Sequence, residues 1–248
     1  MHHVGMKAPS RSPKRWALDE SESKRAELLQ GAPWISGLTD ELRRRVFAES
    51  RIAKVAARNF VCRRGEVADS WIGVLRGLVK IVTITPEGQS TSFIGVPGGG
   101  WFGEGSLLKD EPRRYDGIAM RDSTIAYVPR RTFMLLLDSS TAFNRFLLKQ
   151  LNERLGQFVA MVEYDRLLGP DAKVAKELAG LCNPALYPGI GTKLPISQEE
   201  IAQLVGLSRQ RVNRALRRLE KRGLVRLGYR DLTILDLDGL THFDSQKR

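Results

Sequence analysis

Cysteine and histidine are scarce in this sequence, and their scarcity excludes several kinds of site. The 248 residues include two cysteines, Cys62 and Cys182, and three histidines, all near the ends of the chain. Two thiols cannot build a disulfide framework, which indicates a reducing compartment such as the cytoplasm. They are also too few for a four-thiolate iron–sulfur cluster. Because the middle of the chain has no histidine, neither a histidine-ligated haem nor a catalytic metal ion is expected there.

Long apolar runs are also missing. The densest apolar patch, residues 133–137, is far shorter than the roughly 20 residues that a membrane-spanning helix needs. The N-terminus is basic but has no apolar segment behind it, so it does not read as a secretory signal. Residues 1–25 mix histidine, proline, serine and charge without periodicity and are predicted to be a flexible basic tail. No membrane partner is expected.

Negative charge is scarce relative to positive charge. The chain has 40 Lys and Arg against 28 Asp and Glu, a formal net charge of +12 at pH 7. Residues 193–230 alone carry ten basic and three acidic residues, which is more than half of the excess. A basic excess concentrated in one short segment is the electrostatic signature of a protein that binds nucleic acid.

Short apolar runs separated by glycine predict a β-rich domain over about residues 52–128. The expected strands cover residues 60–62, 71–75, 78–84, 91–96 and 125–128. Residues 86–89 form a good turn between two of them, and many short strands indicate a β-sandwich or roll. Short helices over residues 26–47 lead into this domain, with Thr39 or Asp40 as an N-cap.

A long helix is predicted after Pro129. Its apolar residues at alternating steps of three and four are Leu148, Leu151, Leu155, Phe158 and Val162, which is a heptad seam. The seam fits either packing on the same domain or a dimer, and the dimer is favoured because the helix leads toward a unit that resembles DNA-binding domains. Gly169-Pro170 ends this helix, and another helix follows over residues 171–181.

Two capped helices joined by a glycine turn follow the loop at residues 183–191. Ser197-Gln198-Glu199-Glu200 is a capping box, and Gly206 breaks the first helix where the chain must turn sharply. Ser208 is the N-cap of the second helix, whose buried face is predicted to contain Val212, Ala215, Leu216 and Leu219. Gly223 ends it.

The outward face of the second helix is basic. It carries Arg209, Gln210, Asn213, Arg214 and Arg217, which suits a recognition helix in the major groove because arginine pairs with guanine and Gln or Asn with adenine. Arg211, Arg218, Lys221 and Arg222 are predicted to contact phosphates. Residues 224–227 and 232–235 form a hairpin, the wing, with Arg230 at its tip. A basic helical hairpin with a solvated face is the alternative, but the combination of caps, turn and wing favours DNA binding.

From about residue 35 onward, the chain resembles the cyclic AMP receptor protein and fumarate–nitrate regulator (CRP/FNR) family. The resemblance rests on the glycine-punctuated roll, Phe102-Gly103-Glu104, the long helix, residues 196–202 and residues 206–214. It implies an α+β fold with an antiparallel β-roll of the cyclic-nucleotide-binding jelly-roll type at residues 26–138. A dimerisation helix at 139–168 and a winged helix-turn-helix domain at 169–248 would follow. It also implies a homodimer on an inverted repeat of double-stranded DNA, with RNA polymerase as a candidate partner.

The resemblance assigns roles to particular residues. In this family the first and a later arginine of the recognition helix contact guanines, which implies these roles for Arg209 and Arg214. The position between them that is often glutamate is Gln210 in this chain. Glutamate accepts from cytosine N4 whereas glutamine both donates and accepts, so an altered preference at one base pair is predicted.

The effector pocket departs from the family pattern. Gly103 and Glu104 match the motif whose glutamate takes the ribose hydroxyl, but counting back from Arg121 places Asp116 and Gly117 at the phosphate-holding pair. Aspartate repels a phosphate, so cyclic AMP is expected to bind poorly, and another ligand or none is expected. The exception would be Arg113 or Arg114 taking the phosphate role. The candidate pocket comprises Gly103, Glu104, Arg113, Arg114, Tyr115 and Phe158.

Three other interpretations remain beside the leading one. The chain could be a regulator without a ligand, controlled by its own abundance. It could instead be the cyclic-nucleotide-binding regulatory subunit of an enzyme or channel. A measurement of DNA affinity discriminates this alternative from the leading interpretation, a DNA-binding regulator. An enzyme is least favoured, because Glu104, Ser106, Asp110 and Ser208 show no nucleophile-and-base arrangement with a histidine.

Overall fold

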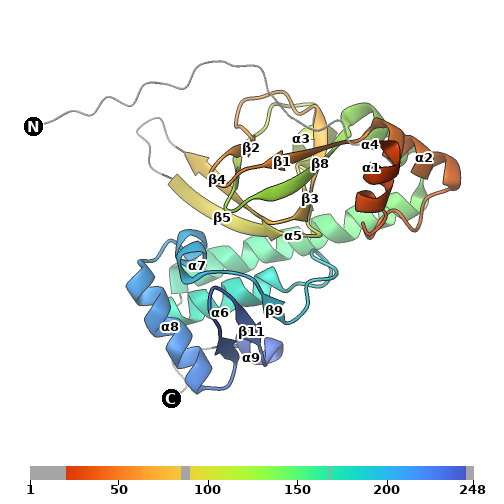
Figure 1. Cartoon of the computed structure of the whole chain (residues 1–248). Helices are drawn as coiled ribbons and strands as arrows, with labels where there is room; N and C mark the ends of the chain where they lie inside the picture. The colour runs from red at the N-terminus through yellow and green to blue at the C-terminus, as the bar shows by residue number, and fades with distance from the viewer. Residues whose placement is uncertain (1–20, 85–89, 168, 244–248) are drawn as a thin grey trace, which may run out of the picture.

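The computed structural model describes residues 21–84, 90–167 and 169–243 and forms two domains joined by a long helix (Figure 1). The N-terminal domain is a β-roll of two four-stranded antiparallel sheets. The first sheet has the order β1 (Arg51–Val55), β8 (Ser123–Pro129), β3 (Ser70–Arg76) and β6 (Trp101–Phe102). The second has the order β2 (Phe60–Cys62), β7 (Asp116–Ala119), β4 (Leu78–Ile84) and β5 (Ser90–Pro97), so β5 is an edge strand. The five predicted strands are present.

Three strands of the roll were not predicted from the sequence. The apolar pattern does not predict β1 or β6, because neither strand is a continuous apolar run bounded by turn residues. β7 contains Asp116 and Gly117, the pair assigned to the phosphate position. Asp116 is buried, and its Oδ1 accepts a hydrogen bond from the Arg64 backbone N–H at 2.9 Å. The pair is therefore part of the sheet framework.

Short helices close one end of the roll. They are α1 (Glu22–Leu29), α2 (Asp40–Glu49), α3 (Glu104–Leu108) and α4 (Arg130–Ser139). The N-cap of α2 is Thr39, which is one of the two residues predicted for this position. The predicted tail extends too far, because Ser21 caps α1 and residues 22–25 are helical; the rest of the tail, residues 1–20, lies outside the described residues. Trp34, Trp71 and Trp101 form the core of this end, with Trp71 and Trp101 ring centroids 4.4 Å apart.

Helix α5 (Thr141–Leu167) runs along the roll and connects it to the C-terminal domain (Figure 1). The predicted heptad seam is split between two faces. Leu151 and Phe158 pack against the roll, whereas Leu148, Leu155 and Val162 are exposed. Val159, which was not part of the predicted seam, is exposed beside them at 62%. The outward face of α5 is therefore an apolar stripe.

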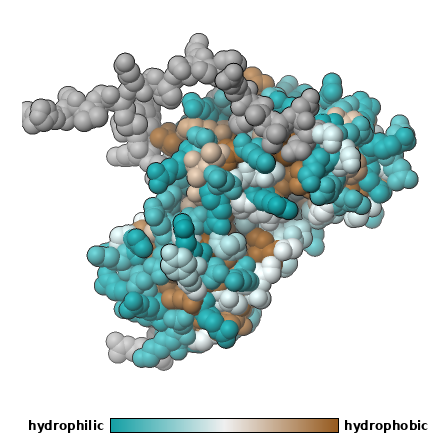
Figure 2. Space-filling view, viewed as in Figure 1, coloured by the Kyte–Doolittle hydropathy of each residue, from teal (hydrophilic) through white to brown (hydrophobic). Residues whose placement is uncertain are grey.

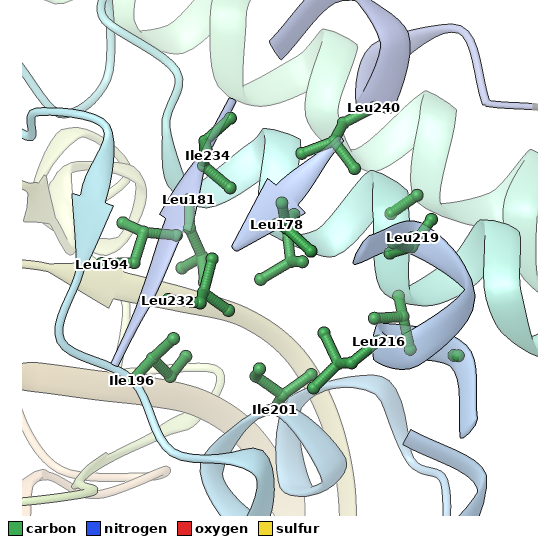
Figure 3. Packing of buried hydrophobic residues seen from close by; sticks show 14 of the residues in the cluster. Leu178, Leu181, Leu194, Ile196, Ile201, Leu216, Leu219, Leu232, Ile234 and Leu240 are labelled. Atoms are coloured by element: carbon green, nitrogen blue, oxygen red, sulfur yellow. The ribbon is translucent and has the colours of Figure 1, made fainter. Parts of the chain in front are cut away.

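The C-terminal domain contains the predicted helices and wing. Its elements are α6 (Pro170–Leu181), α7 (Gln198–Val205), α8 (Arg209–Lys221), α9 (Leu237–Thr241) and a three-stranded sheet with the order β10 (Val225–Leu227), β11 (Leu232–Ile234) and β9 (Lys193–Leu194). Strand β9 was not predicted because it is two residues long. Leu178, Ile201 and Leu216 come from α6, α7 and α8 and point into one core, together with leucine and isoleucine side chains of the small sheet (Figure 3). This packing fixes α8 relative to α6 and α7.

The two domains are in direct contact. The loop after α6 inserts Leu186 and Tyr187 into the core of the roll, and Tyr187 is fully buried there. From the other side, Leu78 of the roll joins the core of the C-terminal domain. An ion pair crosses the boundary, with Arg121 Nη2 at 2.6 Å from Glu200 Oε1.

Candidate nucleic-acid interface and effector pocket

The start of α7 is fixed by the predicted capping box. The Ser197 side chain accepts a hydrogen bond from the Glu200 backbone N–H, and the Glu200 carboxylate accepts from the Ser197 backbone N–H at 2.8 Å. Gly206 ends the helix with φ of 65°, a left-handed conformation that costs glycine little. Ser208 then caps α8. These caps set the sharp bend between α7 and α8.

The predicted reading face of α8 is exposed at its first turns. Arg209, Gln210, Arg214 and Arg217 are exposed, and Arg211 lies in the same turn as the first two. Val212, Ala215, Leu216 and Leu219 are buried on the opposite face, as predicted. The surface of this flank of the C-terminal domain is mostly hydrophilic (Figure 2). Arg211 is exposed as well, so these residues of α8 present four guanidinium groups and one amide to solvent.

Two residues predicted to contact DNA, Asn213 on the outward face and Arg218 at the phosphates, have partners inside the domain. Asn213 is partly buried, and its Nδ2 donates to Gln198 Oε1 of α7 at 2.9 Å. Arg218 Nη1 lies 2.7 Å from Asp171 Oδ2 of α6, and this contact raises the pKa of the Arg218 guanidinium. The helical spacing places both residues near the outer face, but packing of α6 and α7 beside α8 supplies partners that spacing cannot reveal.

The wing lies beside the N-terminus of α8. Its tip contains Tyr229, which is 93% exposed, and Arg230, which has a φ of 64°. Asp231 fixes the hairpin, because its backbone oxygen accepts from Gly228 N–H at 2.9 Å and its carboxylate lies 3.0 Å from Lys193 Nζ. A groove of about 400 Å³ between wing and helix is lined by Ser197, Arg209, Tyr229 and Arg230 among others. Tyr229 was not among the predicted contacts.

Arg113 is the predicted pocket residue that lies inside the roll. It is 4% exposed, and its Nη2 donates to the Ser70 backbone oxygen at 2.5 Å. Its Nη1 has no hydrogen-bond partner among the described residues. A Cβ at position 103 would lie 2.6 Å from that nitrogen, so Gly103, which has a φ of 95°, leaves space for the guanidinium. An unpaired buried donor on a cation is costly, so this corner is suited to an anion.

The other predicted pocket residues are only partly brought together. Glu104 is buried and accepts from Trp71 Nε1 at 3.3 Å, while Tyr115 and Phe158 both pack against the roll core. Burial raises the pKa of the Tyr115 hydroxyl, so it stays protonated. Arg114 does not belong to the pocket. It is exposed, and its Nη2 lies 2.6 Å from Glu111 Oε2.

Sequence reasoning missed Arg154, a second buried guanidinium near this pocket. Arg154 extends from α5 and is 7% exposed. Its Nη1 donates to the Tyr187 hydroxyl at 2.7 Å and to Gln157 Oε1 at 3.1 Å, and its Nη2 donates to the Trp101 backbone oxygen at 3.3 Å. Burial lowers the pKa of Arg154, but its hydrogen bond to the Tyr187 hydroxyl and the nearby Glu104 carboxylate outweigh this effect, so the pKa is raised. An arginine on a long helix gives no sequence signal of such burial.

Within residues 21–84, 90–167 and 169–243, no cluster of three His, Cys, Asp or Glu side chains is placed to hold a metal ion. No helix in the described part of the chain has the length and apolar character to cross a membrane. Both cysteines are buried free thiols.

Comparison with known proteins identifies both domains. Residues 172–243 match the Crp-like helix-turn-helix domain family, and residues 52–140 match the cyclic nucleotide-binding domain family. The cyclic AMP receptor protein of Thermus thermophilus is 27% identical over 210 residues, which cover 81% of this chain and 91% of that protein. The cAMP-activated global transcriptional regulator CRP of Haemophilus influenzae is 26% identical over 175 residues, covering 69% and 78%.

Solved structures show the same fold. FixK2 from Bradyrhizobium japonicum superposes with a TM-score of 0.65 at 18% identity, covering 80% of this chain and 99% of that one. Curated relatives include transcription regulators, and this chain has a cyclic nucleotide-binding domain followed by a Crp-like helix-turn-helix domain. The roll, the connecting helix and the capped α7–α8 pair with its wing therefore identify the chain as a DNA-binding transcription regulator of the CRP/FNR family.

Proposed function

We propose that the chain acts as a homodimer that reads an inverted repeat, with α8 of each copy in the major groove of one half-site. The observation that carries this proposal is the capped α7–α8 pair, which presents Arg209, Gln210 and Arg214 at the exposed start of a rigid helix. Arginine can fork onto guanine O6 and N7, and glutamine can pair with adenine. Arg211, Arg217 and Arg230 lie on the flanks of this face and are suited to phosphate contacts.

The stripe on α5 supports a symmetric dimer. Leu148, Leu155, Val159 and Val162 are between 49% and 67% exposed and lie along one face of a 27-residue helix. A second copy presents the same stripe, so two α5 helices can bury it against each other in a coiled-coil-like contact. A dimer of this kind carries two copies of α8, which is what a repeated half-site requires.

We also infer that the roll senses a small anion at Arg113. The support is the buried Nη1 of Arg113, which lacks a partner among the described residues and lies beside Gly103. Cyclic AMP is the first candidate, because two relatives carry cyclic AMP in their names. Arg113 is one of the two arginines predicted as the exception, and the position of its guanidinium beside Gly103 supports this inference.

The DNA-binding proposal is tested by selecting duplexes from a random-sequence library with the full-length protein, then measuring affinity by fluorescence anisotropy. Arg209→Ala should bind the selected duplex at least tenfold more weakly, because a bidentate arginine–guanine contact contributes about 1–3 kcal/mol of discrimination. Arg44→Ala removes an exposed arginine from α2 of the roll domain and is the matched control, which should bind like the wild type. Equal affinity of Arg209→Ala and the wild type would exclude the proposed interface.

A further inference from the structure

The tip of the wing carries an aromatic side chain that the packing of the domain does not explain. Tyr229 lies between β10 and β11 and is 93% exposed, the largest exposed fraction among the large apolar side chains of the described residues. Its ring has a large apolar surface, and its hydroxyl can donate and accept a hydrogen bond. Because the side chain is left in water, both parts of it are open to a partner outside the protein.

The turn that carries Tyr229 is fixed relative to α8. The Glu220 carboxylate of α8 accepts a hydrogen bond from the Leu227 backbone N–H at 2.8 Å, which ties the first strand of the wing to the helix. The Gly228 N–H donates to the Asp231 backbone oxygen at 2.9 Å, and a Cβ at position 228 would collide with the Asp231 carboxylate. The wing tip therefore keeps a defined position when α8 binds.

The groove between the wing and α8 is suited to one sugar-phosphate strand of DNA. Arg209 lines this groove of about 400 Å³ from the helix, and Arg230 lines it from the wing. Two carboxylates also line it: Glu199, and Asp231, which is ion-paired with Lys193. Guanidinium groups are common partners of phosphates, and a single strand separates a major groove from the neighbouring minor groove. With α8 in the major groove and that strand beside it, the wing tip lies over the minor groove.

The minor groove distinguishes A·T from G·C base pairs. An A·T pair presents only the adenine N3 and thymine O2 acceptors there, whereas a G·C pair adds the guanine N2 amino group. A tyrosine hydroxyl can donate to these acceptors. The amino group obstructs a ring that approaches the floor of a groove only about 6 Å wide. Proteins that bind this groove frequently place apolar side chains in it. A tyrosine at this position therefore favours A·T base pairs.

We propose that Tyr229 is a specificity-determining residue, which enters the minor groove next to each half-site and selects A·T base pairs there. The proposal rests on the proposed function of α8 as the recognition helix and adds a second set of base pairs to the operator. These base pairs lie within about five positions of those that α8 reads, which is half of a helical turn of about 10 base pairs.

The first test compares three versions of the selected duplex that differ only in these neighbouring base pairs. They are made A·T, G·C or inosine·cytosine. Inosine lacks the guanine N2 amino group, so inosine·cytosine has the major-groove edge of G·C but presents only acceptors in the minor groove. The wild type should bind the A·T and inosine·cytosine duplexes with affinities within about twofold. It should bind the G·C duplex about tenfold more weakly, the usual effect of one unfavourable base pair.

Two variants of the wing assign this preference to a side chain. Tyr229→Ala should bind all three duplexes with affinities within about twofold, because the group that meets the guanine amino group is gone. Leu235→Ala removes an apolar side chain that is 47% exposed at the other end of the same hairpin, and it should keep the wild-type preference. Equal affinity of the wild type for the three duplexes would overturn the proposal. A preference that persists in Tyr229→Ala would also overturn it, because DNA shape alone would then be the cause.

A second test locates the wing tip on the duplex. Iron–EDTA is attached to Tyr229→Cys, in a protein whose own cysteines are buried. Hydroxyl radicals released in a minor groove cleave the two strands at sites offset toward their 3′ ends, whereas release in a major groove gives the opposite offset. The expected result is a 3′ offset next to each half-site. A 5′ offset, or the absence of cleavage from a bound protein, would overturn the proposal.

The two tests separate failure of this inference from failure of the proposed function. If the library selection enriches no duplex, the role of α8 is contradicted and the inference falls with it. If the selected duplex binds and Arg209→Ala weakens binding to all three versions equally, α8 reads the half-site as proposed. The minor-groove comparison then depends on Tyr229 alone.

Discussion

Side chains of the same type have different roles in this protein because their neighbours differ. Arg209 is exposed at the start of α8, and Arg218 on the same helix is ion-paired with Asp171. Arg113 is buried, and one of its nitrogens has no partner in the part of the chain that the structure describes. Sequence spacing separates the buried face of α8 from the outer face. Sequence spacing cannot distinguish an exposed arginine that is available to DNA from one that forms an ion pair with a residue of α6.

Gln210 carries the clearest prediction at the residue scale. Its side chain is exposed in the first turn of α8. Glutamate only accepts and favours cytosine N4, whereas glutamine can pair with adenine N6 and N7. Gln210→Glu should change which base is preferred at one position of each half-site, with a discrimination of about 1–3 kcal/mol, or roughly fivefold to a hundredfold. Competition binding against four duplexes that differ at that base pair measures this, and identical rankings for both proteins would exclude the role.

Helix α5 shows how one element can serve two partners. Its inner face packs on the roll through Leu147, Leu151 and Phe158, and Arg154 from the same helix reaches Trp101 and Tyr187. Its outer face keeps four large apolar side chains exposed. A solvated helix face is normally polar, so the exposed stripe indicates a missing partner, which we propose to be a second α5.

Leu155→Lys tests this interface at the element scale. Leu155 is 62% exposed and lies in the middle of the stripe, so the change adds charge to the proposed dimer contact without disturbing the roll. The variant should sediment as a monomer at micromolar concentration, with a thermal unfolding transition of the roll close to that of the wild type. Thr141→Lys makes a similar change at the exposed start of α5 and should leave the assembly unchanged. A dimer in the Leu155→Lys protein would place the interface elsewhere.

At the scale of the whole molecule, α5 lies between the effector pocket and the DNA-binding domain. Arg154 contacts Tyr187, and Tyr187 contacts Gly95 at the edge of the roll. Arg154 is also electrostatically coupled to Glu104 of the pocket. Arg154 therefore connects the pocket residue Glu104 with the side chain of Tyr187 at the contact between the two domains.

Calorimetric titration with cyclic AMP at moderate salt tests the effector proposal. The wild type should give saturable heat, and Arg113→Gln should weaken binding at least tenfold, because a charged hydrogen bond contributes about 1.5–3 kcal/mol. Arg114→Gln is the matched control, since Arg114 is exposed and paired with Glu111, and it should bind like the wild type. Absence of heat with the wild type would exclude cyclic AMP as the effector.

Local patterns in the sequence were sufficient for much of the architecture. Capping residues, glycine turns and helical spacing predict the starts of α7 and α8, the buried face of α8 and the wing, because these features depend on residues a few positions apart. Strands β3, β4, β5 and β8 were likewise predicted by continuous apolar runs. The concentration of basic charge at residues 193–230 predicted DNA as the partner, and the family comparisons confirm that class of function.

Only the tertiary structure decided which residues meet across long distances in the chain. It places Arg113 beside Gly103, engages Arg218 with Asp171, divides the α5 seam between two faces and brings α6, α7 and the loop after α6 to Gly95. These contacts join residues separated by ten to more than a hundred positions. They depend on how helices, strands and loops pack against each other. The spacing of residues within one element does not show which residues of another element lie beside it.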